Sequence, residues 1–145
     1  YPSFRFQMGI SETGITGSPD DETPYPPFKW STEISCSPSY RFTGPDLTLA
    51  LFYKFTGATP QLGFNGDQLG WGWVDPYNTM DFTASKGFFN NRLVLSAGVK
   101  NIFNTTIVPS TTVSGEAHTG AGGGTNIAWG RTVFARLAFQ FNKYK

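Results

Sequence analysis

The sequence predicts an all-β chain that crosses a membrane as part of an antiparallel β-barrel, and two regularities carry this prediction. Six segments alternate apolar and polar side chains with a period of two. Their five connections alternate in length, with 16, 4, 22, 6 and 25 residues. Bacterial outer-membrane barrels have strands of about 9–11 residues, apolar toward lipid and polar toward the lumen, with short turns at one end and longer loops at the other.

The composition is compatible with such a chain and excludes several other classes. Aromatic residues make up 17% of the chain and charged residues 14%, against roughly 25% charged residues in soluble domains. A net charge of +1 gives no reason to expect a nucleic-acid partner. The single cysteine, Cys36, excludes an intrachain disulfide and a cysteine metal cluster, and we expect no metal or cofactor.

The first two expected strands are residues 3–11 and 28–42. The connection between them, residues 12–27, is expected to be a loop, because it contains four prolines and proline cannot donate to a strand ladder. In the second strand, Lys29 and Glu33 lie on the polar face, and Pro38 is expected to mark a bulge or a frayed end.

The next two expected strands are residues 47–56 and 79–86, and the first of them has Lys54 on its polar face. They are joined by residues 57–78, which are expected to be a loop because glycines interrupt them repeatedly. This loop carries Trp71 and Trp73.

The last two expected strands are residues 93–103 and 129–141, joined by a loop that contains His118. Lys100 and Arg136 lie on their polar faces. The apolar face of the final strand comprises Val133, Ala135, Leu137, Phe139 and Phe141.

The placement of the charges is the strongest sign of a membrane. The mid-strand charged residues all lie on the polar faces, and the exceptions, Lys86 and Arg131, lie near strand ends. A cation that faces lipid at mid-membrane costs about 2–4 kcal/mol, and less near the interface. Aromatic residues gather at both strand ends, as interfacial belts do.

Six strands do not close a barrel, because bacterial outer-membrane barrels start at eight strands. An open edge in lipid leaves backbone groups unsatisfied. Either two strands hide in the loops, which would give a small eight-stranded barrel, or the chain is part of a larger barrel. The loops are rich in glycine and proline, so we expect the larger barrel. No signal peptide precedes Tyr1, and we therefore expect a processed chain or a piece of a longer protein.

The second half of the chain resembles a known family. Its motifs are Tyr77-x-x-x-Asp81-Phe-Thr-Ala-Ser, Leu93-x-Leu-x-x-Gly98-Val-Lys-Asn101-Ile-Phe-Asn104, and Gly130-Arg-Thr-Val-Phe with a closing Phe-x-Phe. This order resembles the C-terminal end of TonB-dependent outer-membrane receptors. Relatives usually stop at the terminal aromatic, whereas here four residues follow Phe141.

The resemblance implies a location, a fold and a function. Residues 1–145 would be the last six strands of a 22-stranded barrel in the bacterial outer membrane. The family has a plug domain and a TonB box, the short segment that engages the TonB complex, and neither is in this chain. The implied function is energised import of a scarce, bulky nutrient: a metal chelate, haem, cobalamin, glycan or peptide. The implied partners are the rest of the barrel with its plug, the TonB complex and outer-membrane lipid, with a surface substrate-binding lipoprotein as a further candidate.

Candidate functional residues fall into three groups. Trp71 and Trp73 could stack on a ligand and His118 could bind haem iron or cobalt, although the tryptophans could equally pack or anchor their loop and the histidine could lie in solvent. The resemblance also assigns the end of the last strand, Phe139 and Phe141, to barrel assembly. Residues expected to face the lumen, against a plug or as a solvated wall, are Lys29, Glu33, Lys54, Lys100 and Arg136.

No arrangement of catalytic side chains has motif support, so we do not expect an enzyme. Two alternatives remain open at this point. One is a small eight-stranded structural or adhesion barrel of the outer membrane. The other is a secreted, soluble β-sandwich that acts as a binding module.

Overall fold

The computed structural model describes residues 3–15, 28–65, 68–111 and 123–141. It confirms the prediction of an all-β chain with antiparallel sheets, since 74% of the described residues are in strands and none of them is in a helix. None of the described segments forms a helix that could cross a membrane.

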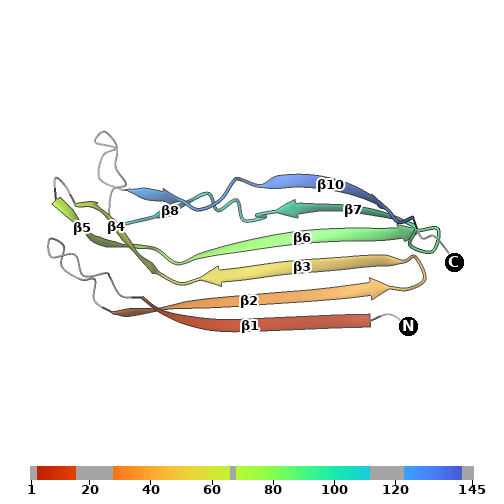
Figure 1. Ribbon diagram of the computed structural model, residues 1–145, viewed down its shortest axis with the longest axis horizontal. Helices are drawn as coiled ribbons and strands as arrows, with labels where there is room; N and C mark the ends of the chain where they lie inside the picture. Colours follow the sequence, from red (N-terminus) through yellow and green to blue (C-terminus); the bar gives the residue numbers. More distant parts are fainter. Residues whose placement is uncertain (1–2, 16–27, 66–67, 112–122, 142–145) are drawn as a thin grey trace.

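One six-stranded antiparallel sheet dominates the molecule (Figure 1). Strands that follow one another within this sheet are also neighbours in it, so the sheet is a meander in the order β1-β2-β3-β6-β7-β10. Its strands are β1 (Ser3–Ile15), β2 (Lys29–Phe42), β3 (Leu47–Thr56), β6 (Tyr77–Phe88), β7 (Leu93–Lys100) and β10 (Thr132–Phe139). The sheet is open, because β1 and β10 each have a neighbour on one side only in the described part of the chain.

Two short hairpins extend from one end of the sheet. The first pairs β4 (Thr59–Asn65) with β5 (Gln68–Val74), and the second pairs β8 (Ile107–Pro109) with β9 (Gly124–Asn126). In Figure 1, β4, β5 and β8 lie at the left, opposite the two short turns of the sheet. We call these ends the long-connection end and the short-turn end. The turn residues 43–46 and 89–92 lie at the short-turn end.

The prediction that residues 57–78 are a loop was wrong, because most of them form the β4–β5 hairpin. The glycines do not prevent pairing: Gly63 lies opposite Gly70, and Gln61 opposite Gly72. This hairpin is a separate two-stranded sheet, and its strands do not join the six-stranded one.

Several strand ends differ from the sequence-based ranges. β1 continues to Ile15, since residues 12–15 lack proline and pair with β2 up to Lys29. β7 stops at Lys100 because Asn101 takes a positive φ of 51°, which breaks the extended backbone. β6 is longer than residues 79–86, and β10 is shorter than residues 129–141.

The expected bulge at Pro38 is absent. Pro38 lies opposite Phe6 of β1, in the same register as the rest of that pair. On the other side, the pairs Cys36–Tyr53 and Ser39–Ala50 have the same register before and after the proline. The alternation of β2 therefore passes through Pro38 unchanged.

The register brings like residues together across the sheet. Leu49, Ala84, Ala97 and Ala135 form one cross-strand row. One position along, Thr48, Ser85, Ser96 and Arg136 form a polar row, in which the Oγ atoms of Ser85 and Ser96 are 2.8 Å apart. The sheet thus has an apolar face, which carries Leu49, and a polar face, which carries Ser85.

The sheet has no hydrophobic core. Among the described residues, only Val74 and Val108 are buried hydrophobic side chains, and both lie in the hairpins. On the apolar face, Val133 is 76% exposed, Leu137 68% and Leu95 44%. A β-sandwich would cover these side chains with a second layer. The described residues place no such layer over them.

One charged residue departs from the expected pattern. Because β1 runs to Ile15, Glu12 belongs to the apolar face, opposite Thr32. The Thr32 hydroxyl donates a hydrogen bond of 2.6 Å to the Glu12 carboxylate. Glu12 lies near the long-connection end of β1, as Lys86 lies near the short-turn end of β6. The middle of the apolar face carries no charged side chain in the described strands.

Close packing on the polar face gives a first testable prediction. A Cβ at Gly98 would meet the Phe134 ring at 2.7 Å and press on the carbonyl oxygen of Phe82. The variant Gly98→Val should therefore lower the free energy of unfolding by about 1–3 kcal/mol, as overpacking does. Urea denaturation of the protein measures this change.

Gly44→Ala is the matched control, because nothing lies within 4 Å of the added Cβ. Equal unfolding midpoints for Gly98→Val and Gly44→Ala would contradict the packing of Phe134 on Gly98.

Candidate functional site

The two hairpins at the long-connection end are joined by backbone pairing. Val74 forms a bridge with Ser110. Beside it, the amide of Asp75 donates to the carbonyl of Pro109 at 2.9 Å, and the amide of Thr111 donates to the carbonyl of Trp73 at 2.9 Å. The Trp73 amide in turn donates to the Thr111 hydroxyl at 2.7 Å. Thus β5 continues its pairing with the segment that follows β8.

A side-chain contact adds to this link. The Gln61 side-chain oxygen accepts hydrogen bonds from the hydroxyls of Ser110, at 3.3 Å, and Thr125, at 2.7 Å. These donors come from the β8–β9 region and the acceptor comes from β4. Together with the buried Val74 and Val108, the contacts make the two hairpins a single small unit at the end of the sheet.

The expected ligand-stacking residues lie in this unit. Trp71 and Trp73 are two apart in β5 and therefore share one side of it, and both are half-buried. The Lys29 ammonium lies 4.3 Å from the centre of the Trp73 ring, in cation–π contact. Trp73 therefore contacts the six-stranded sheet through Lys29 of β2, whereas Trp71 has no cation–π contact among the described residues. His118 lies outside the described residues.

Asn101 joins the end of β7 to two other segments. Its side-chain nitrogen donates to the carbonyls of Thr105 and Trp129, both at 2.9 Å, and its side-chain oxygen accepts the Thr105 amide at 3.0 Å. Its backbone amide donates to the Asp81 carboxylate at 2.8 Å. Asn101 is only 7% exposed, so its polar groups need these partners.

Asn104 completes the same structure three residues later. Its side-chain oxygen accepts the Arg131 amide at 2.9 Å. The Arg131 guanidinium donates twice to the carbonyl of Ile102, at 2.6 and 3.0 Å. Asn101 and Asn104 both have positive φ, a conformation that asparagine tolerates better than most residues. The family-like segments Gly98–Asn104 and Gly130–Arg131 thus form one clasp, which we call the asparagine clasp.

The five residues expected to face the lumen all belong to the polar face by register. The Lys54 ammonium pairs with the Glu33 carboxylate at 2.7 Å, and Lys100 lies 5.8 Å from the centre of the Phe134 ring. Arg136 is exposed in β10. The structure therefore brings Lys54 into an ion pair with Glu33 and Lys29 into cation–π contact with Trp73. Lys100 and Arg136 lie elsewhere on the polar face.

A hollow of about 600 Å³ lies where the polar face meets the asparagine clasp. Asp81 and Lys100 supply its charged groups, and Trp129, 91% exposed, supplies its largest apolar surface. It can hold a ligand or a partner side chain by charge and stacking. The described residues contain no group of three or more potential metal-ligating side chains.

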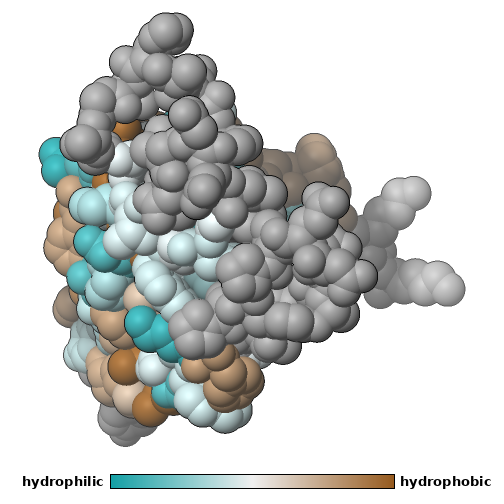
Figure 2. Space-filling view, turned by 90° about the vertical axis from the view of Figure 1, so that its left-hand side faces the viewer, coloured by the Kyte–Doolittle hydropathy of each residue, from teal (hydrophilic) through white to brown (hydrophobic). Residues whose placement is uncertain are grey.

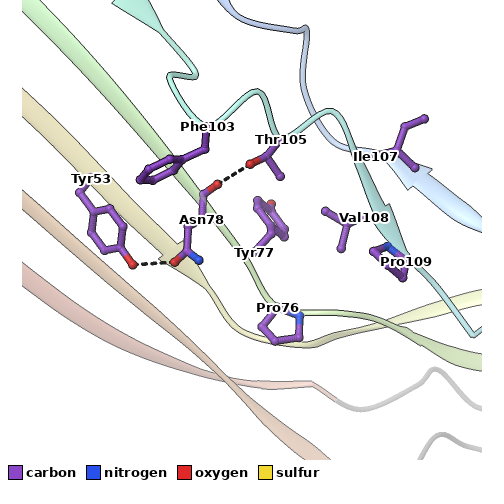
Figure 3. Close-up of a pocket in the computed structure, with 9 residues that line it drawn as sticks. All are labelled: Tyr53, Pro76, Tyr77, Asn78, Phe103, Thr105, Ile107, Val108 and Pro109. Atoms are coloured by element: carbon purple, nitrogen blue, oxygen red, sulfur yellow. Dashed lines mark hydrogen bonds between the residues drawn. The ribbon is translucent and has the colours of Figure 1, made fainter.

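A second hollow, of about 430 Å³, is shown in Figure 3. Its wall includes Tyr53 and Asn78, which belong to the apolar face by register. The Tyr53 hydroxyl donates to the Asn78 side-chain oxygen at 2.6 Å, and the Thr105 hydroxyl donates to the Asn78 carbonyl at 2.9 Å (Figure 3). None of its nine lining residues has a charged side chain.

Seen from the long-connection end, hydrophilic and hydrophobic residues are mixed over the coloured surface (Figure 2). At the opposite end, Phe139 is the last residue of β10 and packs on Phe141, with ring centroids 4.4 Å apart. The ladder to β7 continues one residue past the strand, since the Gln140 amide donates to the Arg92 carbonyl at 2.8 Å. The expected assembly residues thus lie exposed at the short-turn end, with Phe139 as the last residue of the edge strand and Phe141 two residues beyond it.

Sequence reasoning missed Asn101, Gln61 and Trp129 as functional positions. The signal for Asn101 was present, because two asparagines three apart directly after a strand favour left-handed turns. Gln61 carried no signal, since its role depends on two hydroxyls that are 49 and 64 residues away.

Comparison with known proteins gives no relative for this arrangement. No family model, curated protein or solved structure matches the chain.

The asparagine clasp gives a second testable prediction. Asn101→Ala removes three part-buried side-chain hydrogen bonds, each worth about 0.5–1.5 kcal/mol, so it should lower the free energy of unfolding by about 2–4 kcal/mol. Asn101→Gly removes the same bonds but adopts the positive φ without strain, and it should be the less damaging of the two.

Urea denaturation measures both variants, with the exposed Asn126→Ala as the control. If Asn101→Ala unfolds at the same urea concentration as Asn126→Ala, the side-chain bonds do not hold the clasp.

Proposed function

We propose that this chain is the C-terminal portion of the barrel of a TonB-dependent outer-membrane transporter. In this role the six-stranded sheet is a piece of the barrel wall, and the two hairpins are extracellular structure around the mouth. The whole transporter imports a scarce, bulky nutrient, such as a metal chelate, haem, cobalamin, a glycan or a peptide.

The single observation that carries the proposal is the exposed apolar face of a sheet without a core. Thirteen large apolar side chains of this face are exposed: Phe4, Phe6, Met8, Ile10, Trp30, Tyr40, Phe42, Leu51, Phe88, Leu95, Val133, Leu137 and Phe139. They are about half exposed on average, and full burial stabilises each by about 1.5–3 kcal/mol, so leaving them in water forgoes on the order of 10–20 kcal/mol. That loss is comparable with the entire net stability of a domain, roughly 5–15 kcal/mol. A hydrocarbon environment removes the loss.

The open edges favour a part of a barrel over a complete one. Within the described residues, β1 and β10 each lack a second neighbour. Each unsatisfied backbone group in lipid costs several kcal/mol, so further strands must cover both edges. The β4–β5 hairpin does not supply them, because neither of its strands joins the six-stranded sheet. This arrangement argues against the eight-stranded alternative, and the missing second layer argues against the sandwich.

Strand lengths and connections support the proposed orientation. A tilted strand needs about 9–11 residues to cross the bilayer. β1, β2, β3 and β6 reach this length with 13, 14, 10 and 12 residues, whereas β7 and β10 are shorter, with 8 residues each. The two short turns lie at one end and the hairpins at the other, as with periplasmic turns and extracellular loops. The family-like motifs also meet in space, in the asparagine clasp, which fits their being parts of one structural unit.

The import function is tested in cells that carry the intact gene. Deleting the gene should abolish growth on one of the five nutrient classes when that nutrient is scarce, and removing TonB should have the same effect. Growth is measured on each nutrient separately, with a plasmid copy of the gene as the control. Unimpaired growth of the deletion strain on all five nutrients, or growth that is lost on deleting the gene but is unaffected by removing TonB, would contradict a TonB-dependent importer.

The orientation is tested by labelling single cysteines on intact cells, after the native thiol is removed by Cys36→Ser. Asn126→Cys, in the β8–β9 hairpin, should react with a maleimide that cannot cross membranes, because Asn126 is exposed at the proposed extracellular end. Asn90→Cys, in the β6–β7 turn, should react only after the cells are opened. Labelling of Asn90→Cys but not Asn126→Cys on intact cells would reverse the orientation.

A further inference from the structure

We propose that the hollow between the polar face and the asparagine clasp is a binding site for one ring of a neutral oligosaccharide. This inference rests on the proposed function and deepens it, because it selects one nutrient class and names the side chains that recognise it. The hollow has a volume of about 600 Å³. Binding pockets for small molecules measure about 300–1,000 Å³, so a sugar ring with its neighbour in the oligosaccharide fits.

Trp129 presents an exposed ring from a rigid support. The residue is 91% exposed, and its ring has no aromatic or cation–π contact with another described residue. Its carbonyl, in contrast, accepts the Asn101 side-chain nitrogen at 2.9 Å, and the nearby Arg131 amide donates to the Asn104 side-chain oxygen at 2.9 Å. A ring that is held in place but left uncovered loses little freedom when a ligand stacks on it. The apolar C–H face of a pyranose ring is such a ligand surface.

One carboxylate and one ammonium supply the charge of the hollow, so it has no net charge. Asp81 and Lys100 follow the last pair of the β6–β7 ladder, Phe82 with Val99, on neighbouring strands. One side-chain oxygen of Asp81 accepts the Asn101 amide at 2.8 Å, which leaves the other oxygen for a ligand. Lys100 forms no ion pair with a described residue. The hollow therefore offers a strong acceptor and a strong donor, and a hydroxyl group can pair with either.

Two threonines of the polar face extend this set. Thr79 lies two residues before Asp81 in β6, and Thr132 lies opposite Lys100. The Thr132 hydroxyl already donates to the Gly130 carbonyl at 3.0 Å, so it remains available as an acceptor. Acceptors and donors together with an indole ring suit a ligand that is apolar on its ring face and hydroxylated around its edge. Sugars have this combination.

The backbone around the hollow argues against a peptide ligand. The amides of Asn101 and Arg131 already donate to side chains, and the carbonyls of Trp129 and Gly130 already accept from side chains. An extended peptide is bound through free backbone groups that pair with its own amides and carbonyls. These four groups do not offer that pairing, so recognition at the hollow depends on side chains.

The charge balance argues against anionic nutrients. A ligand with several carboxylates, as haem and many metal chelates have, would be repelled by Asp81 as well as attracted by Lys100. Asp81 is also the only aspartate, glutamate, histidine or cysteine among the lining residues, which is too few to coordinate a metal ion directly. A neutral hydroxylated ring meets both charged groups favourably.

An oligosaccharide array tests the proposal on the intact, purified transporter. The protein, in a detergent without a sugar head group, is applied to a printed array of neutral, sulfated and uronic-acid oligosaccharides, with short peptides on the same slide. We expect retention on neutral oligosaccharides. Retention on peptides or on acidic oligosaccharides alone, or on no member of the array, would overturn the proposal.

Variants of the stacking ring test its assignment. Trp129→Ala should weaken the affinity for the best-retained oligosaccharide about tenfold or more, as measured by calorimetric titration. Trp129→Phe keeps a smaller ring and should recover part of this loss. Phe89→Ala is the matched control, because it removes a ring that is 76% exposed at the short-turn end. Equal affinities of Trp129→Ala and Phe89→Ala would exclude the hollow as the sugar site.

A charge variant tests the selection against anions. Asp81→Asn still accepts the Asn101 amide through its side-chain oxygen, but it leaves the Lys100 ammonium unbalanced. The affinity for uronic-acid oligosaccharides should therefore rise about fivefold or more relative to that for neutral ones. An unchanged ratio of the two affinities would show that Asp81 and Lys100 do not face the ligand.

The outcomes separate this inference from the function on which it rests. If no oligosaccharide is retained while deletion of the gene still abolishes TonB-dependent growth on another nutrient, the sugar site is excluded and the proposed transporter stands. If growth of the deletion strain is unimpaired on all five nutrients, the transporter is excluded instead. Retention of neutral oligosaccharides that depends on Trp129 would then leave the sugar site in place without the import function.

Discussion

The structure depends on one constraint: an unbroken period of two, kept in register across six strands. It keeps rows such as Leu49, Ala84, Ala97 and Ala135 on one face and Thr48, Ser85, Ser96 and Arg136 on the other. A shift of one residue in any strand would move its apolar side chains to the polar face. Passage of β2 through Pro38 without a bulge preserves this register.

The two faces define two different environments. Most of the apolar face carries large side chains without a layer to cover them, and its charged residues lie near strand ends. The polar face carries the basic residues, some paired and some not. In the proposed transporter, a single sheet with these two faces would separate hydrocarbon from an enclosed polar space, and the hairpins and the asparagine clasp would stabilise the end where the long connections emerge. The proposed wall and lumen lining both follow from the same alternation.

Alternation made the sheet predictable from the sequence, because each strand of the sheet carries the signal along its own length. The β4–β5 hairpin was not predictable in this way, since its glycines weaken the signal and its stability comes from partners such as Ser110 and Thr125, distant in the chain. The roles of Lys29 and Asn101 required the structure for the same reason. Lys29 was placed on the correct face, but its contact with Trp73 depends on how a 22-residue connection folds back.

The most direct test of the central claim is the accessibility of spin labels at neighbouring positions of β7 and β10 in the intact outer membrane. Labels at Leu95 and Leu137 should be relaxed by oxygen, which concentrates in hydrocarbon, and shielded from a water-soluble nickel complex. Labels at Ser96 and Arg136 should be shielded from oxygen. Equal accessibility at all four positions, or a nickel effect at Leu95 and Leu137 as strong as in water, would contradict a face that lies against lipid.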